Sequence, residues 1–568
     1  MFDLERGLAL AYNGEVYNYR ELRRRLERNW QFASDGDTEV VLAAYAHWGA
    51  ACVEHFNGMF ALAIWSESDQ TLFLARDRLG EKPLYYMQDH CGFAFASEIP
   101  PLALMGANLD IEPHQLTRYI TANTASTFEI DDTTLFRGVN RLQAAHTLTV
   151  RQTNGRSTIL CEPATYWRIE QKRHGADIHT AAQEIAALLD ESVKMRLRSD
   201  VPVGTCLSGG LDSSSIVSSI RKHEPEMELH TFTGAFPGNE TADETKYALR
   251  VAEEFACTPH VVAITPEAFI ANAPTFYAAA GMPVGGLSQF AQWQVFGLAA
   301  EHGVTVLLDG QGSDEIFGGY GGSITQSYLS SLLWKMRFRE FARESRLVAD
   351  TYNHASIQRV KNLTSKWMHR SIVTRWLRPY LSREGSDLVR HGGPKLVDAF
   401  TMSGPNAFDH MVRQLTQETM LPSLLRYGDH LSMHFSREVR LPFCDHRIVE
   451  AAYSLDPSLL VGGGASKLVL REAMRTRLPS DIVVRPKQGF VPPEAEWFGG
   501  PLNLWMIDML DGISPALQRY LNPVAIRDGI RRMSRGEPAR LDPLWRLINL
   551  CAWDRYSRQH LLATQQQQ

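Results

Sequence analysis

The sequence predicts a mixed α/β protein in two parts. Residues 1–170 form a sheet-rich α+β part, and residues 171–568 form an α/β part with a parallel sheet and a mainly helical C-terminal portion. Short apolar runs separated by turn residues fill the first part, whereas strands and amphipathic helices alternate from about residue 180. Such alternation is typical of a parallel sheet covered on both faces, whose ligands bind at the carboxyl ends of strands.

In the first part, the strand expected over residues 8–12 runs into a turn at Asn13-Gly14, and a charged helix begins at Tyr19. Further strands are expected over residues 59–68, 71–80, 92–98, 146–153 and 155–160, the first two as a hairpin.

In the second part, a helix over residues 179–197 precedes the alternation. Strands are expected over residues 201–207, 229–236, 260–264 and 304–310, and helices over 213–223, 242–255, 266–280 and 288–303. Residues 321–480 are expected to be mainly helical.

The composition excludes several classes of protein. The chain has 568 residues, 44% hydrophobic and 21% charged, with a net charge of -6, which gives no general preference for nucleic acid. Its basic run over residues 20–30 interleaves with Glu21 and Glu27, as on a solvated helix face. We expect no membrane partner, because no apolar run reaches ~18 residues and no signal peptide opens the chain. Seven scattered cysteines without CxxC pairs predict reduced thiols in a cytoplasmic protein.

The strongest local signal is the heptad SGGLDSS, Ser208 to Ser214, between an expected strand and an expected helix. Its two glycines allow the backbone to approach a ligand closely, and the N-terminus of the following helix suits phosphate. Asp212 could hold Mg²⁺, which takes one or two carboxylates together with phosphates. The simpler alternative is a glycine turn with a serine N-cap.

The heptad resembles the pyrophosphate-binding loop of ATP pyrophosphatases, and other segments narrow the resemblance to the asparagine synthetase family. These are LLDGQGSDEIFGGY (307–320), SREVRLPFCDHRIVE (436–450) and RPKQGF (485–490) for its synthetase domain, and AYNGEVYNYRELR (11–23) and ARDRLGEKPLYY (75–86) for its glutaminase domain. The resemblance implies an amino-terminal-nucleophile-type sandwich over residues 1–170, incomplete at its start. It implies an ATP pyrophosphatase domain over residues 171–568.

The family's chemistry implies the substrates and cofactors. Glutamine is hydrolysed to ammonia at one site. At the other, ATP with Mg²⁺ activates aspartate as β-aspartyl-AMP with release of pyrophosphate, and ammonia displaces AMP. A homodimer is expected from the resemblance alone.

Site residues carry over by position in the motifs. The resemblance assigns ATP contacts to Leu207, Ser208, Gly209, Gly210, Leu211, Asp212, Ser213, Ser214, Gly234, Asp309 and Gly310. It assigns metal binding to Asp212 and Asp314, and catalysis to Lys487, Gln311 and Asp212. Two positions depart from the family, since Asp309 replaces a serine and Gln311 replaces a glutamate that assists ammonia attack. We expect Arg440 and Asp445 to form structural ion pairs.

In the first part, the resemblance assigns glutamine binding to Asn13, Gly14, Glu15 and Asp37. The family's nucleophile is a cysteine at position 2, where this sequence has Phe2, and the first cysteine is Cys52. We therefore expect the chain as given to begin inside the family's domain, or that domain to be a relic, and in either case not to hydrolyse glutamine. We expect Cys52 to be packed rather than catalytic.

Three functions remain open. The first is an asparagine-synthetase-type ligase. The second is a relative that adenylates another carboxylate, in natural-product or cell-surface biosynthesis, which Gln311 favours. The third is a pseudoenzyme that only binds nucleotide.

Overall fold

The structure is a computed structural model that describes residues 1–89, 92–121, 128–153, 156–159, 162–170, 173, 175–352, 377–391, 404–537 and 541–566. The chain forms two compact units. Unit 1 comprises residues 1–112, 128–170 and 561–568, and unit 2 comprises residues 113–127 and 171–560. The predicted mixed α/β class with a parallel sheet is confirmed. None of the described helices is long and apolar enough to cross a membrane.

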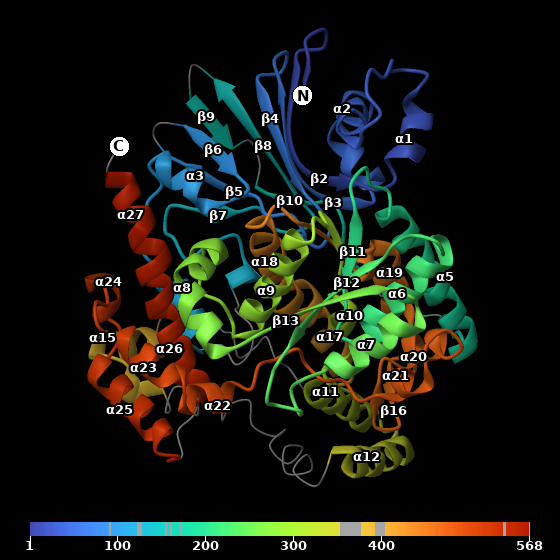
Figure 1. The fold of residues 1–568 in the computed structure, drawn as a ribbon. Helices are drawn as coiled ribbons and strands as arrows, with labels where there is room; N and C mark the ends of the chain where they lie inside the picture. The colour runs from blue at the N-terminus through green and yellow to red at the C-terminus, as the bar shows by residue number, and fades with distance from the viewer. Residues whose placement is uncertain are drawn as a thin grey trace. The chain divides into compact units, whose positions relative to one another are not determined.

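Unit 1 contains two antiparallel sheets (Figure 1). The larger follows the order β1 (Phe2–Asp3), β2 (Leu8–Val16), β3 (Gly58–Ser66), β4 (Thr71–Arg76), β8 (His146–Thr153) and β10 (Ala164–Thr165), with β9 (Arg156–Ile159) also paired to β8. The smaller follows the order β6 (Phe93–Ala96), β5 (Tyr85–Gln88) and β7 (Asn140–Arg141).

Both faces of β3 are buried, and its side chains alternate between two cores. Phe60, Leu62 and Ile64 join the core beneath α1 (Tyr19–Leu26) and α2 (Asp37–Trp48). Ala61 and Ala63 join a second core that includes residues of the smaller sheet. The period of two places successive side chains on opposite faces, so β3 can serve both cores.

The expected turn at Asn13-Gly14 is wrong. Both residues lie inside β2, where Gly14 pairs with Phe60 of β3. Gly14 has φ +145°, and a Cβ there would lie 2.1 Å from the Met59 carbonyl oxygen. The glycine is needed for a close approach of two strands, which the Asn-Gly pair does not distinguish from a hairpin turn.

Unit 2 is built on a parallel sheet of order β13 (Thr258–Ala263), β12 (His230–Ala235), β11 (Val203–Cys206), β14 (Val306–Leu308) and β15 (Glu438–Arg440). The first four match the expected strands. The fifth was not expected, because its three residues Glu-Val-Arg lack the apolar run of the others. The chain moves outward from β11 in one direction to β13 and then returns to the other side at β14, so the topological switch point lies between β11 and β14.

Helices cover both faces of this sheet. Figure 1 shows α6 (Leu211–His223) and α7 (Thr245–Glu254) on one side, and α9 (Ser288–Glu301) and α18 (Met420–Met433) on the other. The remaining described α-helices of unit 2 are α4 (Pro113–Thr121), α5 (Ile178–Arg196), α8 (Pro266–Ala280), α10 (Ser313–Phe317), α11 (Gly321–Trp334), α12 (Phe338–Tyr352), α15 (Arg383–His391), α17 (Ala407–Gln417), α19 (His446–Ser454), α20 (Leu468–Met474), α21 (Ser480–Val484), α22 (Glu494–Gly499), α23 (Leu502–Asp508), α24 (Pro515–Gln518), α25 (Pro523–Ser534) and α26 (Leu541–Trp553).

Candidate active site

Two loops meet at the switch point of the parallel sheet. The first leaves β11 and opens α6, and the second leaves β14 and opens α10. Gly310 of the second loop lies against Asp212, because a Cβ at position 310 would be 3.1 Å from the Asp212 Cβ. The sequence motifs 207–214 and 307–320 therefore lie side by side, although about a hundred residues separate them.

The first loop has a fixed shape. Gly209 has φ +69°, and a Cβ on it would come within 2.3 Å of the Tyr247 carbonyl carbon in α7. Ser208 and Ser213 approach each other, with 3.3 Å between their hydroxyl oxygens. The buried hydroxyl of Ser214 has no hydrogen-bond partner among the described residues. The backbone amide groups and the positive dipole end at the start of α6 suit an anionic ligand.

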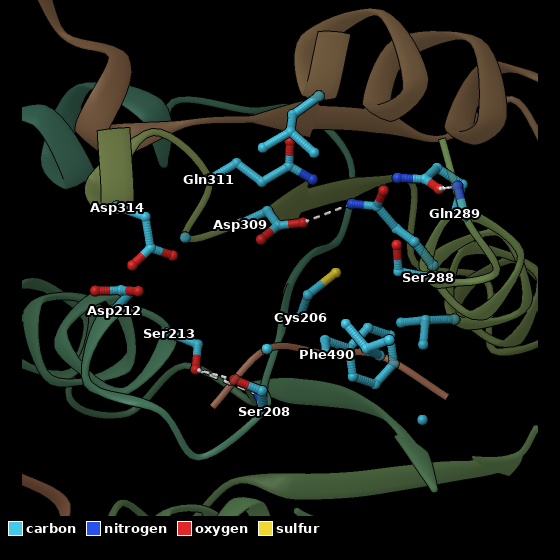
Figure 2. Close-up of a pocket in the computed structure, with 18 of the residues that line it drawn as sticks. Cys206, Ser208, Asp212, Ser213, Ser288, Gln289, Asp309, Gln311, Asp314 and Phe490 are labelled. Carbon is cyan, nitrogen blue, oxygen red and sulfur yellow. Dashed lines mark hydrogen bonds between the residues drawn. The ribbon is translucent and has the colours of Figure 1, made fainter. Parts of the chain in front are cut away.

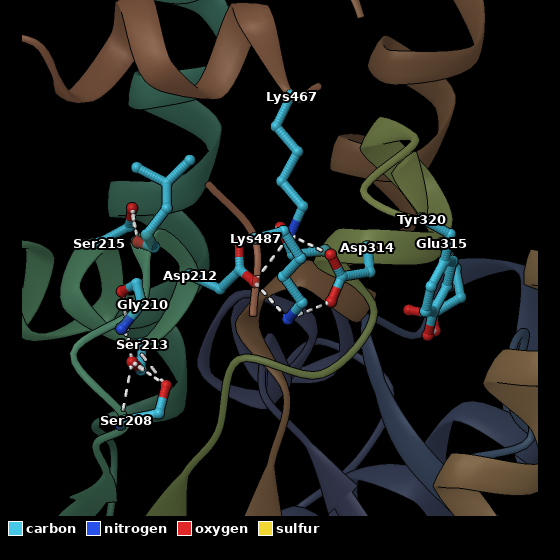
Figure 3. Close-up of polar contacts among 12 residues, drawn as sticks. Ser208, Gly210, Asp212, Ser213, Ser215, Asp314, Glu315, Tyr320, Lys467 and Lys487 are labelled. Atoms are coloured by element: carbon cyan, nitrogen blue, oxygen red, sulfur yellow. Dashed lines mark hydrogen bonds and ion pairs between the residues drawn. The ribbon is translucent and has the colours of Figure 1, made fainter. Parts of the chain in front are cut away.

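Two lysines and two aspartates form a compact cluster beside these loops (Figure 3). The Lys467 Nζ lies 2.7 Å from both carboxylate oxygens of Asp212 and 2.7 Å from Asp314 Oδ1. The Lys487 Nζ lies 2.7 Å from Asp314 Oδ2 and 3.9 Å from Asp212 Oδ2. Ser313 donates a hydrogen bond of 2.8 Å to Asp212. The cluster therefore holds equal numbers of positive and negative charges.

The lysines decide the charge state of the cluster. Burial opposes ionisation of Asp314, but the ammonium groups of Lys467 and Lys487 outweigh it and lower the pKa of Asp314 below its usual range. Partial desolvation of Lys487 opposes its charge, but the carboxylates of Asp314 and Asp212 outweigh this effect and raise its pKa. Both partners are therefore ionised at neutral pH.

A cavity of about 510 Å³ extends from this cluster along the carboxyl ends of the strands. Figure 2 shows Asp212 and Asp314 at one end and Ser288 and Gln289 at the opposite end. The lining includes the predicted residues Leu207, Ser208, Asp212, Ser213, Gly234, Asp309, Gly310, Gln311, Asp314 and Lys487. Gly210 and Leu211 line a smaller adjoining pocket with Lys467. Gly209 and Ser214 are outside the lining of both cavities.

An aromatic ring closes one wall of the cavity. A Cβ at Gly234 would lie 2.7 Å from the ring of Phe490, so only glycine leaves the ring in this place. Leu207 is fixed nearby, since its amide donates to the Phe232 carbonyl at 2.9 Å and its carbonyl accepts from the Thr233 hydroxyl at 2.7 Å. A flat apolar wall of this kind suits a planar ring such as adenine.

The two departures from the family both face the cavity. Gln292 donates to Asp309 at 3.3 Å, and burial raises the pKa of this carboxyl. The side-chain oxygen of Gln311 is buried without a hydrogen-bond partner among the described residues. Gly428 of α18 lies opposite, and a Cβ there would be 3.7 Å from that oxygen. The oxygen faces α18, so it can accept an N–H from a bound molecule only when the Gln311 side chain turns its amide into the cavity.

A second buried carboxyl lines the same cavity. Tyr320 donates a hydrogen bond from its hydroxyl to Glu315. Burial, reinforced by the neighbouring Asp314 carboxylate, raises the pKa of Glu315 to about 7. The sequence motif contained both residues, but no role was predicted for them.

The predicted glutamine residues lie together in unit 1. Asn13, Gly14 and Glu15 belong to β2, and Asp37 begins α2. The Asp37 carboxylate accepts from the Tyr12 hydroxyl at 2.6 Å and from the Val16 amide at 2.8 Å, which fixes it against β2. Asn13 donates to the Ser97 hydroxyl at 3.2 Å.

Cys52 is unsuited to nucleophilic attack. It lies in a 3₁₀ helix over Gly49–His55, fully buried, and burial raises the pKa of its thiol to about 12. A thiol in this state holds no thiolate at neutral pH. The expectation that Cys52 is packed is confirmed.

The predicted ion pairs of Arg440 and Asp445 are present. Arg440 pairs with Glu438 at 2.6 Å, and Asp445 accepts from Arg447 at 2.8 Å and from Arg196 at 3.4 Å. Neither residue lines the cavity, so they support the fold around β15 and α5.

The donor set of the cluster fits Mg²⁺. Asp212 and Asp314 present carboxylates to a single shared ammonium, at the mouth of a loop suited to phosphate. In proteins, this ion is usually bound by one or two carboxylates together with phosphate oxygens of the substrate. No group of three or more His, Cys, Asp or Glu side chains among the described residues could hold a metal without such help.

Sequence reasoning missed Lys467. It lies 255 residues from Asp212 and directly before α20, in a segment without a recognisable motif. Two glycines before it, Gly463 and Gly464, turn the hairpin of β16 (Val461–Gly462) and β17 (Ala465–Ser466). A lysine after a tight hairpin is a weak signal, and only the fold brings it to the carboxylates.

Comparisons with known proteins agree with this geometry. The model of the asparagine synthase family matches residues 184–555, and that of a glutamine amidotransferase domain matches residues 1–167. The chain is 30% identical over 499 residues to the glutamine-hydrolyzing asparagine synthetase 3 of Bacillus subtilis, covering 85% of this chain and 75% of that protein. It is 28% identical over 549 residues to the amidase chry2 of Gibberella zeae, covering 88% and 79%.

The two family models together match residues of both units, and the motifs that line the cavity fall within residues 184–555. The chain belongs to the asparagine synthase family.

Proposed function

We propose that this chain is an ATP-dependent amide ligase that activates aspartate as β-aspartyl-AMP, releases pyrophosphate and transfers the acyl group to ammonia. The observation that carries the proposal is the neutral cluster of two lysines and two aspartates, placed where the loops after β11 and β14 meet. Such a cluster can hold a metal-bound triphosphate and stabilise the charge that develops on pyrophosphate as it leaves.

Each part of the cavity has a proposed task. The part of the cavity beside Leu207, Gly234 and Phe490 takes the adenine, and the loop from Leu207 to Ser214 takes the phosphates, with Asp309 and Gly310 on the other side. Asp212 and Asp314 would hold Mg²⁺, which would neutralise phosphate charge. Lys487 would donate to the oxygen that bridges the α- and β-phosphates as that bond breaks.

Gln311 acts on the second half-reaction in this proposal. When its side chain turns the amide into the cavity, the unpartnered oxygen accepts an N–H of the incoming amine and orients the nitrogen lone pair toward the acyl carbon. It cannot take up the proton that the amine loses. We propose that Glu315, a carboxyl in the lining of the same cavity whose pKa lies near neutrality, takes up this proton.

A second candidate function is adenylation of another carboxylate. Asp309 and Gln311 favour it, because both change the cavity wall where the family has serine and glutamate. The similarity to a protein named as an amidase, at nearly the same identity as to the synthetases, adds support.

Release of pyrophosphate tests the proposal. The chain is incubated with ATP and Mg²⁺, with aspartate and ammonium or with aspartate and glutamine. We expect pyrophosphate and asparagine with ammonium. Formation of asparagine together with glutamate in the glutamine reaction would show that unit 1 supplies ammonia, and loss of both products in Asp37→Asn would identify Asp37 as a glutamine ligand.

The control is Asp212→Asn, which keeps the size of the side chain and should abolish release. If aspartate gives no pyrophosphate, a panel of other carboxylic acids follows. Release with one of them establishes the second candidate, and no release with any acid leaves only nucleotide binding.

A further inference from the structure

The two lysines of the cluster differ in how they are held. The Lys467 side chain is 3% exposed and lies within 3.3 Å of the Ser313 hydroxyl in addition to the two carboxylates. The Lys487 side chain is 37% exposed and makes one short contact, to Asp314 Oδ2. A buried ammonium is costly unless it stays paired, whereas an exposed one can leave its partner for water or phosphate.

The backbone around Lys467 is also constrained. Lys467 has φ +56°, an unfavourable conformation for a residue with a side chain, at the point where the β16–β17 hairpin meets α20. Gly319 makes room for it, because a Cβ there would lie 2.4 Å from the Lys467 Cε and 1.9 Å from Asp314 Oδ1. The hairpin, the glycine and the strained residue together aim this ammonium between the carboxylates.

Lys487 lies on a different kind of segment. Residues 485–490 have no regular secondary structure. The segment is anchored before the lysine, where Arg485 pairs with Glu244 and lies over the ring of Tyr247 at 3.7 Å. The Lys487 side chain can thus change partners without unfolding its anchor.

We propose that Lys467 is a positioning residue that permanently holds Asp212 and Asp314 together and takes the place of a cation in the ligand-free site. Lys487 is the exchangeable ammonium: it leaves Asp314 Oδ2 for the phosphates when nucleotide and Mg²⁺ arrive together. The inference rests on the proposed nucleotide function of this site, and it assigns the two lysines different tasks within it.

The two ammonium groups determine whether Mg²⁺ can bind before the nucleotide. Mg²⁺ alone would have to compete with Lys487 and remain beside the fixed charge of Lys467, without any phosphate to compensate. The site therefore excludes free Mg²⁺ and admits it only together with nucleotide. Removing Lys467 leaves two facing carboxylates with a single ammonium, which is an attractive site for the bare ion.

Thermal unfolding of the whole chain tests this without any carboxylate substrate. For the wild type, we expect no change of Tm with Mg²⁺ alone, and an increase with Mg²⁺ and α,β-methylene-ATP. Lys467→Met should lower the Tm without ligand by roughly 5 °C or more, since it breaks a buried pair. Mg²⁺ alone should restore at least half of that loss.

Two variants serve as controls. Lys222→Met breaks another lysine–aspartate pair of unit 2, with Asp190 at 2.6 Å, but the Lys222 side chain is 59% exposed, so the Tm should stay near that of the wild type and should not respond to Mg²⁺ alone. Lys487→Met should change the ligand-free Tm by less than Lys467→Met, because the side chain is partly exposed.

The inference is overturned if Mg²⁺ alone raises the wild-type Tm as much as Mg²⁺ with the analogue does. It is also overturned if Lys467→Met folds and gains nothing from Mg²⁺. The wild-type Tm values with Mg²⁺ alone and with Mg²⁺ and the analogue test the exclusion of free Mg²⁺ even if Lys467→Met does not fold. A chain that releases no pyrophosphate with any acid would disprove the proposed function but leave these results interpretable.

Discussion

At the scale of single residues, the site combines fixed and exchangeable charges. Lys467 and the two carboxylates are held by burial, whereas Lys487 reaches the cavity from a segment without regular structure. Groups that are already in place stabilise transition-state charge best, because they need no rearrangement during the reaction. The free energy needed to bring these charged groups together is supplied during folding.

Lys487→Ala tests the proposed role of this ammonium in cleavage of the α–β phosphate bond. We expect pyrophosphate release to fall by on the order of 100- to 1000-fold, the usual effect of losing one donor to transition-state charge. The Tm should stay near that of the wild type. A rate equal to that of the wild type would make Lys487 an ordinary surface lysine.

Gln311→Leu separates the two half-reactions. Exchange of labelled pyrophosphate into ATP in the presence of the acid reports adenylation and should persist, because the residue contacts neither lysine. Amide formation should fall by about 100-fold, since the nucleophile loses an oriented acceptor. Equal losses in both assays would contradict a role confined to the amine. Gln311→Glu is the companion variant, and faster asparagine formation would identify Gln311 as limiting that step.

At the scale of elements, the sequence predicted what depends on local pattern. The apolar strands β11 to β14 and the amphipathic helices between them follow from periodicity, and the heptad after β11 follows from its glycines and serines. The errors have a common cause. Gly14 inside β2, the short polar strand β15 and Lys467 before α20 all depend on contacts between segments far apart in the chain.

The close packing of the heptad against α7 gives a test at this scale. Gly209→Ala should destabilise unit 2 by more than ~2 kcal/mol and weaken nucleotide binding, because the new Cβ meets the α7 backbone at 2.3 Å as well as straining φ. The matched control is Gly238→Ala, which has φ +82° but open space around it. Similar Tm losses for the two variants would mean that backbone strain alone, and not packing against α7, requires Gly209.

At the scale of the molecule, unit 2 is held around its sheet by buried ion pairs as well as by apolar packing. Asp445 links α5 to the start of α19 through Arg196 and Arg447. Burial opposes its ionisation, but these arginines outweigh it and lower the pKa of Asp445 below its usual range. Its contribution to stability is therefore present above the unfolded-state pKa of about 3.9, and is lost as the pH falls through that value toward the folded pKa.

Asp445→Asn checks this pH dependence. At pH 7 the Tm should fall by several degrees, the effect of leaving arginines without their buried partner. The difference from the wild type should begin to shrink as the pH falls below about 4, where the wild type starts to lose this contribution. Asp511→Asn, which breaks an exposed pair with Arg527, should match the wild type at every pH. A constant difference between Asp445→Asn and the wild type would show that the carboxylate is not preferentially ionised in the folded chain.

Different elements of unit 2 form the two parts of the cavity, so evolution can change the residues of one part without changing those of the other. The phosphate end of the cavity comes from the loops after β11 and β14, whereas helices α9, α18 and α26 contribute Ser288, Leu424 and Arg546 to the rest of its lining. Under the proposed function, substitutions on these three helices would change the acid that is accepted while the phosphate-binding loops stay unaltered. A combinatorial library restricted to these positions, selected by pyrophosphate release, would turn one adenylating scaffold into a family of ligases with new acyl donors.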